Sequence, residues 1–378
     1  MSSGVNEARR LVAHRGACPV ISLYMDLDPE QFPTPHARSV EIGSLLDEAA
    51  RMVESHERLP HDQKIALREE VKRIRSYLSA PESPFKGARG LAVFSSADGL
   101  FETIKLTRPV PRQVAIEPKP FVAPMLEAVQ TRRWLVALVN RRSARLLAGS
   151  PDGLSEGPPL DDDVRGRTER GGWSQANYER SIEHDVEAHL KRIAELVNGR
   201  WRAERFDRLA IGGPQETVPR FEELLAQQVR AQLAPGRVDV DISSATDAQI
   251  RDVVERLVAE DEKRVEREAL DRLEAGLGSG GRAAGGPEAT VEALNERRVE
   301  TLLLEPGFDR LGERCPTCGL LLVEADGICP ADGSQLEEVD HLREAVVEAA
   351  IAQDADVMVV RSYPDLGPQR GIAALLRF

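Results

Sequence analysis

Residues 134–139, Trp-Leu-Val-Ala-Leu-Val, are six consecutive apolar residues, a run too apolar to lie on a protein surface. After Asn140-Arg141-Arg142, a second apolar stretch at 144–147 predicts the other strand of a hairpin. Helix-like and strand-like patterns then alternate as helix 178–197, strand 209–211, helix 216–232, strand 238–242 and, behind the candidate N-cap Thr246, helix 247–274. This alternation predicts an α/β fold whose sheet is covered on its faces.

The segments on either side of this region repeat the alternation. Before it, we expect strand 20–25, helices 37–54 and 61–78, and strands 90–94 and 101–106. After it, we expect helix 288–297, strand 299–304, helix 340–353, strand 357–360 and an apolar end at 372–378. We therefore predict three α/β domains, at residues 1–124, 125–275 and 276–378.

Two passages mark the predicted domain boundaries. The first holds five prolines between residues 109 and 124, and is either an interdomain connection or an extended edge segment. The second, residues 276–286, consists of Gly, Ser and Ala apart from Leu277 and Arg282, and is expected to be a flexible loop.

Composition narrows the class of protein. The 378 residues carry a net charge of −13 and a pI near 5.2, so indiscriminate binding to nucleic acid is excluded and any RNA contact must be local. No stretch of about eighteen apolar residues occurs, which predicts a cytoplasmic protein with no membrane contact. Three of the four cysteines are clustered, which favours a metal site over disulfides.

The local charge reverses around Gly171-Gly172-Trp173-Ser174-Gln175. This turn lies in a segment that holds only two glutamates, Glu169 and Glu179, but four arginines: Arg165, Arg167, Arg170 and Arg180. Paired glycines allow a sharp bend, and the helix expected to follow presents its positive N-terminal dipole to an anion. The alternative is a polar loop whose Trp173 packs back on its own domain.

The clustered cysteines lie in two short segments that have the same residue spacing. Cys315-Pro316-Thr317-Cys318-Gly319 is matched by Cys329-Pro330-Ala331-Asp332-Gly333, with Asp332 where a fourth cysteine is expected. Zinc accepts thiolate and carboxylate ligands, so these four residues predict a structural Zn²⁺ ribbon at residues 312–335, with His341 as the rival fourth ligand. Cys18 lacks a partner in the sequence and is expected to be a small core residue.

The order of these parts resembles the superfamily of archaeal and eukaryotic class-I termination factors and Pelota, in the divergent form found in bacteria. The resemblance rests on five features in this order: the turn at residues 171–175 before a long helix, the loop at 276–286, the segment Val291–Leu294 before the strand at 299–304, the Cys-Pro-x-Cys insertion, and the apolar segment Gly371–Arg377. It implies an RNase H-like middle domain and a last domain that is a small α/β sandwich like the ribosomal proteins that bind kinked RNA turns. It also implies a ribosome-binding protein.

In termination factors of this superfamily, a Gly-Gly-Gln tip orients water onto the peptidyl-tRNA ester. Here Trp173 and Ser174 separate Gly171-Gly172 from Gln175, which is closer to the Gly-x-x-Gln of Vms-type peptidyl-tRNA hydrolases. The resemblance implies that Gln175 positions the water and stabilises the oxyanion, and that Trp173 stacks on an unpaired base. It also implies that the four arginines neutralise acceptor-stem phosphates.

Three functions remain open from the sequence. The first is a rescue factor that hydrolyses peptidyl-tRNA on stalled ribosomes or large subunits, with possible delivery by a translational GTPase and without stop-codon reading, since residues 1–125 hold no Asn-Ile-Lys-Ser motif. The second is a non-catalytic hibernation factor of the Balon type that occupies a vacant A site. The third is an RNA-processing module using His184 and His189, but residues five apart on a helix diverge, and we expect both to be solvated.

Overall fold

The computed structural model describes residues 3–57, 59–80, 88–106, 108–129, 132–149, 154–157, 160–161, 175–240, 242, 244–278, 281–363 and 366–378. These residues form two compact units, one made of residues 3–130 with 266–378 and the other of residues 131–265. No helix in the described ranges combines the length and the apolar character needed to cross a membrane. The fold is mixed α/β, as predicted, while the division into three domains stays a prediction.

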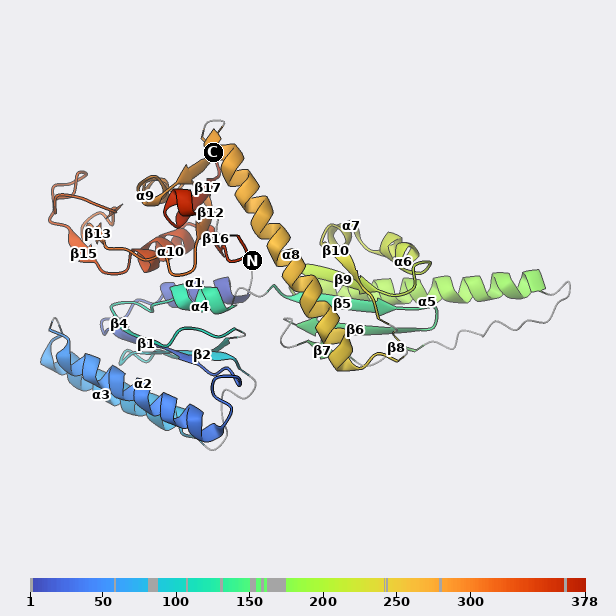
Figure 1. Cartoon of the computed structure of the whole chain (residues 1–378), viewed down its shortest axis with the longest axis horizontal. Helices are drawn as coiled ribbons and strands as arrows, with labels where there is room; N and C mark the ends of the chain where they lie inside the picture. The colour runs from blue at the N-terminus through green and yellow to red at the C-terminus, as the bar shows by residue number, and fades with distance from the viewer. Residues whose placement is uncertain are drawn as a thin grey trace. The chain divides into compact units, whose positions relative to one another are not determined.

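The first part of the larger unit is an antiparallel sheet with helices on both faces (Figure 1). Its strand order is β3-β2-β1-β4. The elements are α1 (Ser3–Val12), β1 (Val20–Asp26), α2 (Pro35–Ser55), α3 (His61–Leu78), β2 (Gly90–Ser95), β3 (Phe101–Leu106), β4 (Gln113–Glu117) and α4 (Ala123–Val129).

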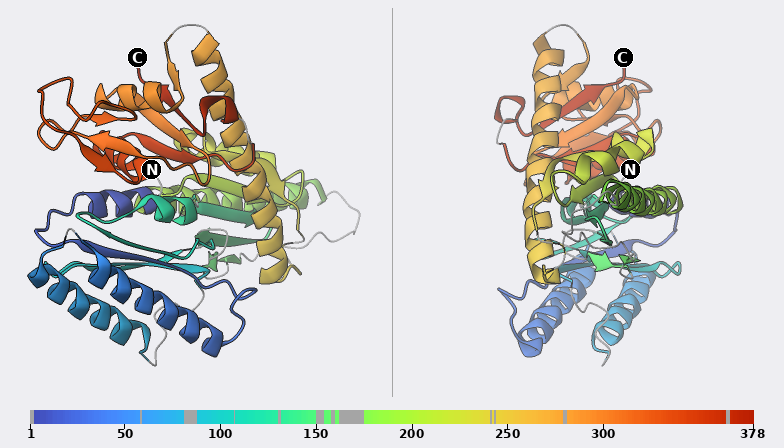
Figure 2. Two further views of the ribbon diagram at one scale, coloured as in Figure 1. Left: turned by 60° about the vertical axis from the view of Figure 1, so that its left-hand side comes forward. Right: turned by 90° about the vertical axis from the view of Figure 1, so that its right-hand side faces the viewer.

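The alternation of β1 explains why both faces of this sheet are covered. Ile21, Leu23 and Met25 pack against α2 and α3, whereas Val20 and Tyr24 point to the opposite face, toward α1 and α4. Figure 2 shows the α2 and α3 pair along one side of the sheet. Both faces of the sheet are therefore buried in hydrophobic cores.

A second sheet in the same unit has the order β11-β17-β12-β16. A separate three-stranded ribbon in this part of the chain has the order β14-β13-β15. In chain order, the elements of the sheet and the ribbon, with their helices, are β11 (Ala283–Gly285), α9 (Pro287–Asn295), β12 (Val299–Leu304), β13 (Gly312–Arg314), β14 (Leu321–Leu322), β15 (Glu337–Val339), α10 (Leu342–Ala352), β16 (Asp356–Val359), the 3-10 turn η2 (Gly367–Gln369) and β17 (Ile372–Leu376). One hydrophobic core joins the two sheets, since it contains residues from Ala8 to Leu376 around α1, α4 and α10.

Polar contacts fasten α4 and the segment before it to α10. Glu344 accepts the backbone N–H groups of Val122 and Ala123 at 2.7 and 2.8 Å. Arg343 pairs with Glu127, and Lys119 pairs with Glu348. Burial raises the pKa of Glu344 to about 7, despite the opposing effect of the two N–H groups.

The smaller unit is a three-layered α/β structure. Its sheet has the order β10-β9-β5-β6-β7, with β8 also paired to β6. The elements are β5 (Trp134–Val139), β6 (Ser143–Gly149), β7 (Ser155–Glu156), β8 (Leu160–Asp161), α5 (Gln175–Ala203), β9 (Arg208–Gly212), α6 (Val218–Leu224), α7 (Gln227–Arg230), β10 (Leu233–Val238) and α8 (Asp247–Gly278), whose residues from 266 onward belong to the other unit. Helices α5, α6 and α7 cover one face, and the first half of α8 covers the other.

Three local predictions differ from the structure. The strand expected at 238–242 lies earlier, at β10, where Pro235 and Gly236 are accommodated because β10 is an edge strand whose register shifts between Leu233 and Arg237. The helix expected at 216–232 is two short helices, α6 and α7, separated by Leu225 and Ala226. The proline-rich passage contains the edge strand β4, in line with one of its two predicted alternatives, and the domain boundary predicted there stays a prediction. The loop expected at 276–286 is shorter, since α8 continues to Gly278 and β11 pairs with β17.

Candidate functional site

The predicted catalytic loop lies outside the part of the chain that the structure describes. This applies to Gly171, Gly172 and Trp173 as well as to Arg165, Arg167 and Arg170. Gln175 is the first residue of α5, and its side chain is likewise outside the described part. Arg180 is exposed on the second turn of α5. The roles assigned to these residues therefore stay predictions.

The structure describes the packing of α5, the helix that follows this loop, from Ile182 onward. Helix α5 buries Ile182, Val186, Leu190 and Ile193 against the sheet, at spacings of three and four that place them on one face. His189 is only 2% exposed, so its expected solvation was wrong, whereas His184 is exposed as predicted. The two histidines thus have different surroundings, which argues against a catalytic pair.

Two turns meet at the carboxyl edge of the parallel strands β5 and β9. Gly213 has a φ of +147°, and a Cβ there would lie 2.1 Å from the carbonyl oxygen of Val139, so only glycine fits this close approach. On β5, the Asn140 side chain accepts the backbone N–H of Arg142 and of Ser143, both at 2.8 Å, which fixes the hairpin turn. The Gly212-Gly213-Pro214 segment is a strand-end turn, as predicted.

Arginines gather along this edge. Arg141 pairs with Glu216 at 3.3 Å, and Arg220 of α6 pairs with Glu183 of α5 at 2.9 Å. Arg142 is exposed in the same turn as Arg141. Ion pairs thus connect the β5–β6 turn to the residues before α6, and α6 to the N-terminal third of α5. Local sequence patterns could not predict this arginine-bearing edge, because Arg220 follows Arg141 by 79 residues in the chain.

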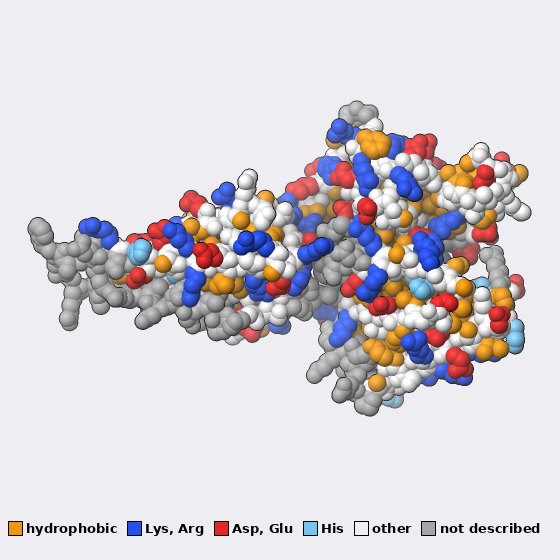
Figure 3. All heavy atoms as spheres, turned by 180° about the vertical axis from the view of Figure 1, so that it is seen from behind, with side chains coloured by type: hydrophobic (Ala, Val, Ile, Leu, Met, Phe, Trp, Pro, Cys, Tyr) orange, Lys and Arg blue, Asp and Glu red, His pale blue; other side chains and the backbone are white. Residues whose placement is uncertain are grey.

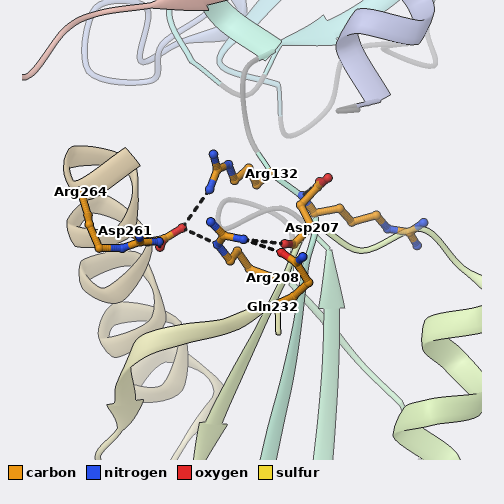
Figure 4. Close-up of polar contacts among 7 residues, drawn as sticks. Arg132, Asp207, Arg208, Gln232, Asp261 and Arg264 are labelled. Atoms are coloured by element: carbon orange, nitrogen blue, oxygen red, sulfur yellow. Dashed lines mark hydrogen bonds and ion pairs between the residues drawn. The ribbon is translucent and has the colours of Figure 1, made fainter. Parts of the chain in front are cut away.

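A buried ion cluster lies at the opposite, amino-terminal end of β5 and β9 (Figure 4). Asp261 of α8 is fully buried and contacts Arg132 at 3.1 Å, Arg208 at 3.0 Å and Arg264 at 2.6 Å. Arg208 also donates to Gln232 at 2.6 Å. Burial alone would raise the pKa of Asp261, but Arg264 and Arg208 lower it below its usual range. These contacts anchor α8 to the sheet.

The side chains of the cysteine cluster converge as the ligands of one metal ion would. The ligand atoms of Cys315, Cys318, Cys329 and Asp332 all lie within 4.8 Å of one another. The Sγ atoms of Cys318 and Cys329 are 3.6 Å apart, and Cys315 Sγ lies 3.4 Å from Asp332 Oδ2. Tetrahedral Zn²⁺ with S and O ligands needs separations of about 3.5–3.8 Å.

The neighbours of these ligands support the same conclusion. The Cys318 backbone N–H points to Cys315 Sγ at 3.4 Å, as in a metal-binding knuckle. Hydrogen bonds from Ser334 hold the pKa of Asp332 well below its usual range, so the carboxylate is ionised. His341, the rival ligand, instead contacts Asp309 at 2.6 Å and the ring of Phe121. Of the two candidates for the fourth ligand, Asp332 therefore lies with the three cysteines, and this cluster could hold a metal ion.

Comparisons with known proteins agree with this architecture. Residues 120–273 match the model of bacterial archaeo-eukaryotic release factor family 10. Peptide chain release factor subunit 1 of Thermococcus sibiricus is 26% identical over 356 residues, which covers 83% of each chain. The same factor of Pyrococcus abyssi is 27% identical over 251 residues, 58% of this chain and 60% of that protein.

Solved structures of similar proteins include an archaeal translation termination factor and Archaeoglobus fulgidus Pelota. The first is 18% identical and covers 99% of this chain and 97% of its own, with a TM-score of 0.29. The second is 20% identical and covers 76% and 79%, with a TM-score of 0.31.

These sequence matches support membership of the superfamily of archaeal and eukaryotic release factors and Pelota. Within that superfamily, the matching model is that of the bacterial family 10.

Proposed function

We propose that this protein is a ribosome-associated rescue factor that hydrolyses the peptidyl-tRNA ester on stalled ribosomes or large subunits, without reading a stop codon. The observation that carries the proposal is the match of residues 120–273 to a release-factor family, because this region includes Gly171–Gln175, which lead into α5. The archaeal release factors that match over 83% of the chain support the same class of activity.

The chemistry that we propose needs no titrating base. The Gln175 amide holds a water against an ester that is already activated, and its backbone N–H stabilises the developing oxyanion. Gly171 and Gly172 allow the loop to approach the ester closely. Trp173 stacks on an unpaired base, which fixes the loop in place.

Arginines near the loop supply the contacts to RNA. We propose that Arg165, Arg167, Arg170 and Arg180 neutralise acceptor-stem phosphates, and that the basic edge of the smaller unit extends this surface. That edge includes the exposed Arg142 and the half-buried Arg141. Since each neutralised phosphate releases counterions, binding should weaken as salt rises.

We also propose that Cys315, Cys318, Cys329 and Asp332 hold one structural Zn²⁺. The ion would fix the two knuckles of the ribbon to each other and would supply no catalytic step, because all four ligands come from the protein. The donor spacing and the ionised Asp332 support this assignment.

The alternative is a hibernation factor that occupies a ribosome without hydrolysis. It is favoured by one observation, the insertion of Trp173 and Ser174 between the glycine pair and Gln175. In that case the loop only occupies space on the ribosome, and Gln175 makes a contact there without taking part in hydrolysis. Delivery by a translational GTPase is compatible with both functions and stays a prediction.

A release assay separates the two functions. Labelled nascent chain would be followed on purified stalled ribosomes and on large subunits bearing peptidyl-tRNA, with wild type, Gln175→Ala and the exposed control Gln228→Ala. Hydrolysis requires release by wild type and Gln228→Ala but not by Gln175→Ala, with equal co-sedimentation of all three. Tight co-sedimentation without release would favour hibernation, and equal release by all three would remove Gln175 from the mechanism.

A further inference from the structure

The zinc ribbon has one sheet face against the core and one turned away from it. Arg314 of β13 is directly opposite Leu321 of β14, so both side chains lie on the same face. This is the inner face, because Leu321 is 3% exposed in the core and Arg314 pairs with Glu348 of α10. Residues one position along a strand point to the other face. Glu313 and its directly opposed neighbours therefore form the outer face of the ribbon.

The outer face places two like charges directly across from each other. Glu313 of β13 is opposite Glu338 of β15, and opposed side chains on one sheet face lie close together. Among the residues that the structure describes, neither carboxylate has a hydrogen bond or an ion pair, and Glu313 Oε2 is buried without a partner. Such a pair costs stability, so a cation between the two carboxylates would offset an existing repulsion.

This pair lines an open hollow of about 400 Å³ on the ribbon. The other lining residues are Leu311, Gly312, Val323, Glu324, Ala325 and Leu336. Leu311 is 60% exposed, and Ile328, elsewhere on the ribbon, is 63% exposed. Figure 3 shows hydrophobic and acidic side chains together on the ribbon, the lobe at the upper right of that view. The hollow thus offers both apolar surface and negative charge.

The charge of the whole ribbon determines what can bind there. Residues 311–340 contain one basic residue, Arg314, and seven acidic ones, which are Glu313, Glu324, Asp326, Asp332, Glu337, Glu338 and Asp340. This net charge of −6 is close to half of the chain's −13. Such a surface repels RNA phosphates and attracts lysine and arginine side chains.

We propose that the outer face of the ribbon, defined by Leu311, Glu313, Leu336 and Glu338, binds an extended basic segment of a ribosomal protein. A lysine or arginine of that segment lies between Glu313 and Glu338, and its aliphatic neighbours pack on Leu311 and Leu336. This inference rests on the proposed ribosome association and adds its protein partner. The smaller unit, which carries the arginines, contacts RNA, whereas the outer face of the ribbon contacts protein.

The first test measures binding of a defined probe to the full-length, zinc-loaded chain. The probe is a dye-labelled peptide, Gly-Lys-Val-Arg-Leu-Lys-Gly, and its charge-reversed partner has glutamate at each basic position. Fluorescence anisotropy should show binding of the basic peptide alone. The double variant Glu313→Gln/Glu338→Gln should bind at least about fivefold more weakly, because it loses both charges that face the cation.

A matched control removes the same charge from other parts of the ribbon. Asp326→Asn/Glu337→Gln lies outside the hollow and should bind the basic peptide within twofold of wild type. Thermal melting adds a second readout, since Glu313→Gln/Glu338→Gln should melt higher than wild type once the repulsion is removed. A purely structural role for the pair would instead lower the melting temperature. Equal peptide binding by wild type and both variants would overturn the proposal.

The second test identifies the partner on the ribosome. A carbodiimide joins carboxylates to lysine amines, so treatment of the ribosome complex followed by mass spectrometry should give crosslinks from Glu313 or Glu338 to ribosomal-protein lysines. Photo-crosslinks from Leu311 to rRNA would overturn the inference. If the chain does not co-sediment with ribosomes at all, the proposed function fails, while peptide binding still decides whether this face accepts a basic segment.

Discussion

Replacement of Asp261 by asparagine should destabilise the smaller unit more than any surface change on α8. Asparagine keeps the shape but removes the charge that compensates Arg132, Arg208 and Arg264. Loss of one member of a buried ion cluster costs about 3–5 kcal/mol. The side chains of the three arginines are 27%, 17% and 35% exposed and keep part of their hydration, so we expect the lower end, about 3 kcal/mol.

The helix provides a matched control in Asp252→Asn. Asp252 is 70% exposed and pairs with Arg256 one turn away at 2.9 Å, an arrangement worth about 0.5 kcal/mol. For a unit of this size, 1 kcal/mol shifts the melting temperature by about 3 °C, so we expect losses of about 9 °C for Asp261→Asn and about 1–2 °C for the control.

Scanning calorimetry of the full chain measures both shifts, and hydrogen exchange in β5 and β9 assigns the transition to the smaller unit. The lowered pKa of Asp261 adds a pH signature. The ionised Asp261 stabilises the fold at pH values above its pKa in the unfolded chain, which is about 4, and this stabilisation is lost as pH falls through its lower pKa in the folded chain. The stability of the asparagine variant should therefore lack this decrease at acid pH. Melting of Asp261→Asn within 2 °C of Asp252→Asn would refute the reasoning.

Three further predictions follow from other parts of the structure. Glu344 has a pKa of about 7 in the folded chain, whereas its ordinary value is 4.5. Between these two pH values the folded chain keeps a proton that the unfolded chain has lost, so the free energy of unfolding falls by about 1–3 kcal/mol as pH rises. Glu344→Gln should therefore have the same melting temperature as wild type at pH 5 and a higher one at pH 8, and an equal difference at both pH values would contradict this. Cys318→Ala should lower the metal content from one zinc per chain, with exchange protection lost in the ribbon alone, and elemental analysis with hydrogen exchange checks both. Arg141→Glu/Arg142→Glu should weaken ribosome co-sedimentation at least about tenfold at 50 mM salt with a shallower salt dependence, and unchanged sedimentation would remove these residues from the RNA surface.

Continuous apolar runs and helical periodicity predicted most of the elements. Strand 299–304 was predicted to the residue, and the hairpin at 134–147 followed from two runs separated by a polar turn. These predictions succeeded because local pattern alone decides whether such segments are buried. The cluster of Cys315, Cys318, Cys329 and Asp332 was predictable for the same reason, since the spacing of each pair is local.

Elements that depend on distant partners could not be predicted from local pattern. Ala283–Gly285 is a strand only because β17, about 90 residues later, supplies its hydrogen bonds. Asp261 finds Arg132 and Arg208 at separations of 129 and 53 residues, and one acid within a charged helix gives no sign of burial. The Glu313–Glu338 pair likewise needs the register of the ribbon, which no sequence pattern gives.

The core that contains both Ala8 and Leu376 also constrains how the chain folds during synthesis. β17 lies between β11 and β12, so the sheet that α9 and α10 cover stays incomplete until residues 372–376 have left the exit tunnel. The helices α1 and α4, made hundreds of residues earlier, can pack against the first sheet but lack the α10 side of this core until then. A nascent chain interrupted before α10 and β17 therefore leaves part of this core open, and transiently exposed apolar surface of this kind favours misfolding and aggregation.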